Sequence, residues 1–295
     1  MHNCILITAY TDIPYLFRLV ENFDGNFDIY IHIDKKAEIK QSYIHALSIM
    51  KGVKKVDSVY SINWGGRNHV DAILWLCQEA LTKSPNARFF HLISGNDIMV
   101  KSINYFVSFF ESTYNNYISY FSLPCQQWIE GGLNRLIYKH PLDRLNIKDD
   151  KDYQVYQRFL RFQKNSNFKR KLPQFQLYGG SSWWSLSRTA IEYIIDNYNW
   201  KGWYNRLEDS FVSDEMYFQT LLMNSPLRES VCNDNLRYIQ WTLKNGNIPA
   251  VLDETDIADI QKTNTMFARK VNSKISFKLI NYMNKTLSIW DRENK

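Results

Sequence analysis

Apolar residues in the first 125 positions follow two alternating patterns, short continuous runs and one-sided helical spacing. The continuous runs predict buried strands, at residues 3–9, 27–33, 53–60, 88–93 and 117–123. Apolar positions three and four residues apart predict the helices between them, at residues 12–20, 38–50, 68–81 and 103–110. Strands that alternate with helices predict an α/β fold, in which a mostly parallel, Rossmann-like sheet is flanked by helices.

The second half of the chain is irregular at first and then returns to the same alternation. Residues 126–176 are strongly basic, and we expect a solvated helix and loop there, with a mobile lid or an acceptor-side insertion as the alternative. The αβ pattern resumes at Leu177 and runs to Trp241, and a C-terminal helical region begins at Asp253. Because no internal repeat or low-complexity linker interrupts the chain, we expect a single domain over residues 1–295.

Polar turns follow three of the predicted strands. Ligands of open parallel sheets bind beyond the carboxyl ends of the strands, near the point where the strand order reverses. Turns that meet at this edge therefore predict a ligand site, and contact with a nucleotide is the functional interpretation of its aspartates. An ordinary strand-end turn is the alternative. The turns are Asp34-Lys35, Trp64-Gly65-Gly66 and Ser94-Gly95-Asn96-Asp97.

Two adjacent indoles follow a small-residue segment in the second half of the chain. Residues 179–182, Gly-Gly-Ser-Ser, predict a tight turn whose amides and hydroxyls, Ser182 among them, face a ligand. Because side chains alternate along a strand, we expect one of Trp183 and Trp184 in the core. The other indole is then available to stack on a sugar ring.

A carboxylate pair lies at the predicted start of a helix. Ser213 is a natural N-cap, which places Asp214 and Glu215 in the first helical turn. Acids there complement the helix dipole, and this is the structural explanation for both. The functional explanation is that the helix terminus keeps Glu215 ionised, as a general base requires.

Composition limits the classes of binding partner and the compartment that we expect. The net charge of +6 favours anionic partners such as sugar nucleotides or anionic lipid surfaces, and no basic block interleaved with aromatics indicates nucleic acid. Aromatics at 15% suit either sugar stacking or a thick aromatic core. The four cysteines are widely scattered, which predicts reduced thiols in a cytosolic protein. No apolar run reaches the roughly 20 residues of a membrane span.

The residues do not suggest a metal site. The one Asp-x-Asp, Asp150-Lys151-Asp152, follows no strand and is expected in a charged surface loop, and no His or Cys cluster has ligand spacing. A leaving diphosphate would then need protein cations, for which Arg269 and Lys270 in their apolar context are the candidates. The apolar face of residues 275–290 predicts a packing helix or, alternatively, a peripheral membrane contact.

Taken in order, seven motifs resemble the core-2/I-branching β-1,6-N-acetylglucosaminyltransferase family, which includes the peptide O-xylosyltransferases. The resemblance covers nearly the whole chain. The motifs are Ile29-Tyr30-Ile31-His32-Ile33-Asp34-Lys35, Asn63-Trp64-Gly65-Gly66, His91-Leu92-Ile93-Ser94-Gly95-Asn96-Asp97, Gly180-Ser181-Ser182-Trp183-Trp184-Ser185-Leu186-Ser187-Arg188, Ser213-Asp214-Glu215, Leu236-Arg237-Tyr238-Ile239-Gln240-Trp241 and Met266-Phe267-Ala268-Arg269-Lys270.

This resemblance implies a GT-A-like fold and an inverting, metal-independent transfer from a UDP-sugar, without a cofactor. The family's base is matched by Glu215, and its diphosphate-binding lysine by Lys270. The family's companion arginine lies earlier, where residues 249–252 read Pro-Ala-Val-Leu and contain no arginine. We therefore assign its diphosphate contact to Arg269. The family also has a proline soon after the aspartate matched by Asp97, and this chain has none there.

The resemblance divides the chain into a nucleotide-sugar-binding half (1–125), an acceptor and catalytic half (126–250) and a diphosphate-binding segment (251–295). We assign acceptor binding to Ser182, Trp183, Trp184, Asp214 and Trp241. We assign donor binding to Asp34, Lys35, Trp64, Gly65, Gly66, Ser94, Gly95, Asp97, Arg269 and Lys270.

The animal members of the family carry a membrane anchor, a stem and disulfides that this sequence does not show. We therefore expect a bacterial cytosolic enzyme, peripheral at the inner face of the membrane, that builds surface glycans on a glycan or lipid-linked oligosaccharide acceptor. GlcNAc, xylose and galactose stay open as donor sugars. The alternatives are a metal-dependent GT-A transferase that uses Asp97 or Asp34, and a non-catalytic protein that binds glycans or lipid surfaces.

Overall fold

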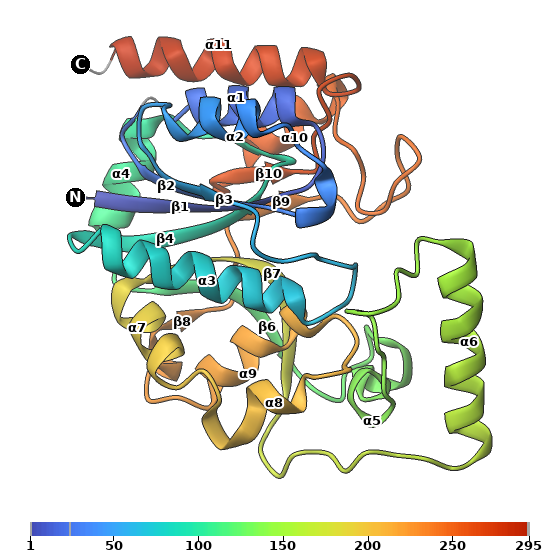
Figure 1. Ribbon diagram of the computed structural model, residues 1–295. Coiled ribbons are helices and arrows are strands. Elements are labelled where there is room, and N and C mark those ends of the chain that lie inside the picture. The colour runs from blue at the N-terminus through green and yellow to red at the C-terminus, as the bar shows by residue number, and fades with distance from the viewer. Residues whose placement is uncertain (1, 24, 294–295) are drawn as a thin grey trace.

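The computed structural model describes residues 2–23 and 25–293, and a seven-stranded sheet runs through the molecule (Figure 1). Its strand order is β3-β2-β1-β4-β7-β6-β8. The strand β7 runs antiparallel to both β4 and β6, and the other neighbouring pairs are parallel. The strands are β1 (His2–Ala9), β2 (Asp28–Ile33), β3 (Val53–Asp57), β4 (Ala87–Ser94), β6 (Asn116–Ser122), β7 (Tyr178–Ser187) and β8 (Val231–Cys232).

Side chains of β1 point alternately into two hydrophobic cores, one on each face of the sheet. Ile5 and Ile7 belong to the first core, and Cys4 and Leu6 to the second. The first core is covered by α1 (Ile13–Glu21), α2 (Gln41–Ser48), α4 (Ile103–Glu111) and α11 (Phe277–Glu293). The second is covered by α3 (Asn68–Lys83), α7 (Arg188–Asp196) and α9 (Tyr217–Met223).

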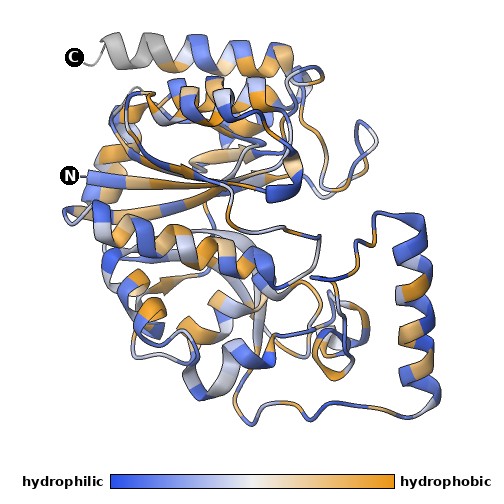
Figure 2. Ribbon diagram, in the orientation of Figure 1, coloured by the Kyte–Doolittle hydropathy of each residue, from blue (hydrophilic) through white to orange (hydrophobic). Residues whose placement is uncertain are grey.

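The predicted α/β, GT-A-like architecture is therefore confirmed, because a mostly parallel sheet lies between two helical layers. Figure 2 shows apolar stretches along the central strands, and both apolar and polar stretches on the helices that cover them. The remaining short helices are η1 (Lys35–Ala37), η2 (Ile129–Gly132), α5 (Asn134–Ile137), η3 (Trp200–Gly202), α8 (Trp203–Arg206), η4 (Ser213–Glu215), η5 (Arg228–Ser230), η6 (Glu254–Asp256) and α10 (Ile257–Lys262).

A second, three-stranded sheet joins distant parts of the chain. It consists of β5 (Asp97–Met99), β10 (Phe267–Arg269) and β9 (Arg237–Ile239), and β10 lies in the middle. The region from Asp253 onward was expected to be helical, and β10 corrects this. Its strand conformation depends on partners about 170 and 30 residues earlier, at β5 and β9, so local periodicity did not reveal it.

Arg237 connects the small sheet to the large one. The pairing of β4 with β7 ends at Leu92 and Trp184, and Arg237 donates hydrogen bonds to both of their carbonyl oxygens, at 2.9 and 2.7 Å. It also donates to the Ser185 hydroxyl at 2.8 Å. Burial lowers the pKa of Arg237 to about 9. The residue therefore satisfies carbonyls that the separating strands leave without ladder partners.

The basic segment 126–176 contains one long helix, α6 (Asp150–Asn165), set apart at the side of the molecule (Figure 1). The predicted solvated helix is thus present. Asp150-Lys151-Asp152, however, begins this helix and does not form the expected loop. The reason is the side chain of Asp149, which accepts hydrogen bonds from the Lys151 and Asp152 amides and caps the helix.

The helix α11 packs on the first core. Leu279 and Met283 of the predicted apolar face are buried, whereas Ile275 and Tyr282 are 42% and 40% exposed. The packing interpretation therefore accounts for the buried part of this face, and the side chain of Trp290 lies outside the described residues. No helix in the described chain combines the length and apolar character needed to cross a bilayer. All four cysteines are free thiols.

Replacing Arg237 with Met removes the donors to two buried carbonyls while keeping a long side chain. Because unsatisfied buried groups cost about 1–3 kcal/mol each, we expect the free energy of unfolding to fall by about 3 kcal/mol. Urea denaturation followed by circular dichroism measures this change. Arg228→Met, at an exposed position, is the matched control. An equal effect of both substitutions would show that the sheet connection is not the cause.

Candidate active site

The carboxyl ends of β1, β2 and β4 meet at one edge of the sheet, as the polar turns predicted. The Asp34 amide donates to the Ala9 carbonyl at 2.8 Å, and the Gly95 amide donates to the Thr8 carbonyl at 3.0 Å. A Cβ atom on Gly95 would lie 3.0 Å from the Cβ of Ala9, so glycine permits this close approach. The segment leading into the Trp64 turn joins the same edge, because the Ile62 amide donates to Oδ1 of Asp34 at 3.1 Å.

The turn that carries Glu215 is hydrogen-bonded to the Trp64-Gly65 turn at this edge. The Val212 amide donates to the Gly65 carbonyl at 2.8 Å, and η4 follows directly. The predicted N-cap is wrong, because the Ser213 hydroxyl donates to backbone carbonyls of residues 207 and 210 and caps no amide. The helix α9 begins only at Tyr217. Glu215 therefore lies in a separate turn ahead of that helix.

Glu215 pairs with an arginine that the sequence analysis missed. The Nη1 atom of Arg135 donates to the Glu215 carboxylate at 2.7 Å, and its guanidinium lies 3.4 Å from the centre of the Trp128 ring. Burial, followed by the charge of Asp214, raises the pKa of Glu215, while Arg135 and Arg269 oppose this shift. The Glu215 side chain stays 27% exposed. A partly buried carboxylate with a raised pKa is suited to accept a proton.

Asp214 connects the Glu215 turn to β7 and α3. Its Oδ2 atom accepts a hydrogen bond from the Ser182 hydroxyl at 2.6 Å and lies 3.0 Å from Nδ1 of His69, at the start of α3. Although burial opposes ionisation, His69 and Ser182 together hold the pKa of Asp214 below its usual value. With this oxygen occupied by two protein groups, Asp214 positions the turn that carries Glu215.

The two indoles have different environments. Trp184 is fully buried and packs against Phe218, at 5.5 Å between ring centres. This position corrects its assignment to the acceptor. Trp183 is 7% exposed, and the guanidinium of Arg269 lies 4.1 Å from its ring centre. Both indoles are thus buried and belong to the second core, so the predicted outward-facing indole is wrong, and Arg269 covers a face of Trp183.

Residues 179–182 form part of β7 and not the tight turn that was expected. A Cβ atom on Gly180 would meet the backbone carbonyl oxygen of Ser119 in β6, and one on Gly179 would lie 2.5 Å from the Trp128 ring. The glycines therefore allow close packing of β6 and of Trp128, the ring that supports Arg135.

Asp97 and Arg269 form a buried ion pair at the same edge. The Nε atom of Arg269 donates to Oδ1 of Asp97 at 3.0 Å, and the Ser94 hydroxyl donates to the same oxygen at 2.5 Å. The side chain of Asp97 is fully buried, and that of Arg269 is 11% exposed. Asp97 and Ser94 are therefore both buried, and both contact the guanidinium of Arg269.

The other predicted residues differ in exposure and in their contacts. Trp64 is 52% exposed and lies edge-on to Phe211, and Lys35 is exposed. A Cβ atom on Gly66 would clash with the carboxylate of Asp143, so Gly66 makes room for a protein side chain. Trp241 is 65% exposed, and the described residues give it no ring contact.

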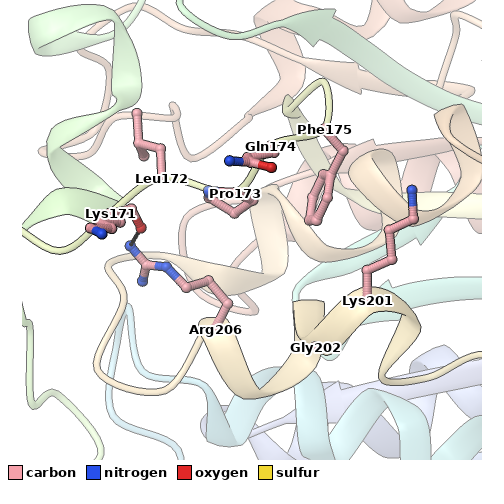
Figure 3. A pocket seen from close by; sticks show the side chains of 8 residues that line it. All are labelled: Lys171, Leu172, Pro173, Gln174, Phe175, Lys201, Gly202 and Arg206. Carbon is pink, nitrogen blue, oxygen red and sulfur yellow. Dashed lines mark hydrogen bonds between the residues drawn. The ribbon is translucent and has the colours of Figure 1, made fainter.

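The structure also bears on two other kinds of site, a metal centre and a surface pocket. Within residues 2–23 and 25–293, no group of three or more His, Cys, Asp or Glu side chains converges as metal ligands. An open pocket elsewhere contains none of the predicted site residues, as Figure 3 shows. Its lining is Lys171, Leu172, Pro173, Gln174, Phe175, Lys201, Gly202 and Arg206.

Local sequence contained little to reveal Arg135 and His69. Arg135 lies 80 residues before Glu215, in a segment where basic residues are common. His69 lies 145 residues before Asp214 and has no metal-ligand spacing. Only the folded chain brings each of them to its carboxylate.

Known proteins support the motif-based assignment. The family model of the Core-2/I-Branching enzyme matches residues 4–266. A β-glucuronosyltransferase of Arabidopsis thaliana, GlcAT14A, is 34% identical over 128 residues, covering 38% of this chain and 28% of its own. Xylosyltransferase 1 of Mus musculus is 24% identical over 289 residues, covering 88% of this chain and 27% of its own.

This chain therefore spans only about a quarter of the length of these relatives. Among solved structures, a glycosyltransferase involved in glycosylation of the major capsid of PBCV-1 covers 98% of this chain, with a TM-score of 0.39 and 9% identity. The match of the family model covers most of the chain. The chain belongs to the Core-2/I-Branching enzyme family, a family of glycosyltransferases, as the order of its motifs predicted.

Proposed function

We propose that this protein transfers a sugar from a UDP-sugar to a hydroxyl of a glycan acceptor, with inversion at the anomeric carbon. The observation that carries the proposal is the partly exposed Glu215 carboxylate, with a raised pKa, at the edge where the strands end. The cations Arg269 and Lys270 lie at the same edge, beside the end of β4. A base and a set of cations are the two parts that this reaction needs.

In the proposed step, Glu215 takes the proton of the acceptor hydroxyl as its oxygen attacks the anomeric carbon. The new glycosidic bond forms on the face opposite the diphosphate, and the old carbon–oxygen bond breaks. Its electron pair leaves with UDP, whose developing charge is stabilised by Lys270 and Arg269. Arg135 holds the Glu215 carboxylate in place and limits the rise of its pKa.

Metal independence is part of the proposal. The metal-dependent alternative would use Asp97 or Asp34. The Oδ1 atom of Asp97 is bound by Arg269 and Ser94, and Oδ1 of Asp34 accepts from the Lys36 and Ile62 amides. Because these carboxylate oxygens are already bonded to protein groups, the geometry supports a mechanism in which protein cations replace the metal.

The relatives suggest the first donors to test. Their names give glucuronosyl and xylosyl transfer, so UDP-glucuronic acid and UDP-xylose belong beside UDP-GlcNAc in the first panel. The role in bacterial surface glycans, the cytoplasmic location and the peripheral membrane contact stay predictions.

Glu215→Gln keeps the size of the side chain and removes the base. We expect UDP-sugar binding to persist while kcat falls at least about a hundredfold, because a positioned base contributes roughly 10²–10⁴ in rate. Steady-state kinetics and titration calorimetry measure the two quantities, with the exposed Glu208→Gln as control. Turnover near the wild-type value in Glu215→Gln would remove Glu215 from the mechanism. Glycan binding without any transfer by the wild type would favour the non-catalytic alternative.

Metal removal tests the second element of the proposal. Turnover of the EDTA-treated, dialysed protein is expected to equal that of the untreated protein, and added Mn²⁺ or Mg²⁺ is expected to have no large effect. The measurement is the initial rate of UDP release. Loss of activity in EDTA with recovery in Mn²⁺ would establish the metal-dependent alternative.

The pH profile tests the pairing of Glu215 with Arg135. Since the pKa of Glu215 is raised above 4.5, kcat should fall with decreasing pH around a midpoint above that value. Removing the opposing charge in Arg135→Gln should raise this pKa further and move the acid limb to higher pH. Arg135→Lys, which keeps the charge, should leave the limb near its wild-type position. An unchanged limb in Arg135→Gln would show that Arg135 does not set this pKa.

A further inference from the structure

Arg269 supplies only part of the second positive charge that the donor diphosphate needs. Its Nε atom is bonded to the Asp97 carboxylate at 3.0 Å, and its guanidinium covers the Trp183 ring. Because Asp97 balances much of its charge and its side chain is 11% exposed, Arg269 has limited capacity to face an incoming anion. The diphosphate carries more than one negative charge, and Lys270 supplies only a single positive one.

Lys148 brings a further positive charge to this edge of the sheet. Its ammonium group lies 5.6 Å from the centre of the Tyr10 ring, and Tyr10 directly follows the last residue of β1. Tyr10 is 51% exposed and Lys148 is exposed, so both remain open to a ligand. The cation–π contact keeps the long lysine side chain above the end of β1.

The segment that carries Lys148 is fastened at both ends. Asp143 accepts a hydrogen bond from the Asn68 amide, at the start of α3, at 2.9 Å. On the other side, the Asn146 amide donates to Asp152 of α6 at 2.7 Å, and the Lys148 amide donates to the Asn146 side chain. Residues 143–149 thus form a connection with a defined path.

Lys148 and Lys270 are close enough to influence each other. Burial, followed by the charges of Arg269 and Lys148, lowers the pKa of Lys270. Within the part of the chain that the structure describes, neither lysine has a carboxylate at ion-pair distance. Asp97 offsets part of this effect, and a bound anion would relieve the repulsion between the positive charges that remains.

We propose that Lys148 is a further cation for the donor diphosphate and acts from the 143–149 connection together with Lys270 and Arg269. The inference rests on the proposed function, since it concerns the same donor site. It assigns to the acceptor-side segment a direct part in donor binding, in place of the arginine that residues 249–252 lack. Lysine binds phosphate as a point charge, so no bidentate geometry is required.

The test is titration calorimetry of the full chain with UDP and, separately, with uridine. Lys148→Ala is expected to weaken UDP binding about five- to tenfold, as one lost exposed charge contact predicts, and to leave uridine binding unchanged. The affinity of the wild type for UDP should decrease with salt more steeply than that of Lys148→Ala. In the transferase assay, the KM for the donor should rise accordingly.

Two variants serve as controls. Lys148→Arg keeps the charge and is expected to retain UDP affinity within about twofold of the wild type. Lys151→Ala removes an exposed lysine three residues further on and should have no effect. Equal UDP affinity of Lys148→Ala and the wild type would overturn this inference and leave the proposed function intact. Failure of the wild type to bind UDP would overturn both.

Discussion

The buried ion pair between Asp97 and Arg269 is the interaction on which the site depends. The two residues stand opposite each other in the β5–β10 ladder, and the Val271 amide donates to the Asn96 carbonyl just beyond it. Removing one partner would leave the other charge buried and uncompensated, so the pair strongly favours this register. The C-terminal segment is thereby held against the end of β4, and Lys270 is placed at the edge where the donor is proposed to bind.

The antiparallel strand β7 brings the second half of the chain to that edge. Because it runs against β4, its beginning lies toward the carboxyl ends of the parallel strands. Ser182 is thus able to bind Asp214, and Trp183 to meet Arg269. A parallel strand at this position would have directed the same residues to the opposite edge of the sheet.

The two neighbouring carboxylates, Asp214 and Glu215, are separated in role by their surroundings. His69 and Ser182 stabilise the charged form of Asp214, and its pKa is lowered in spite of burial. Burial and the charge of Asp214 raise the pKa of Glu215, with Arg135 as the counterweight. Adjacent residues with pKa values shifted in opposite directions are typical of acid–base sites, in which one group positions and the other reacts.

The amino-acid sequence determined the strand–helix alternation, the edge at which the polar turns meet and the segment that carries Glu215. These features follow from local periodicity and from the order of short motifs, both of which are written along the chain. The sequence did not reveal β10, the strand path of residues 179–182, the buried position of Asp97 or the pairing of Arg135 with Glu215. Each of these depends on contacts between residues far apart in the chain, and only the tertiary structure brings those residues together.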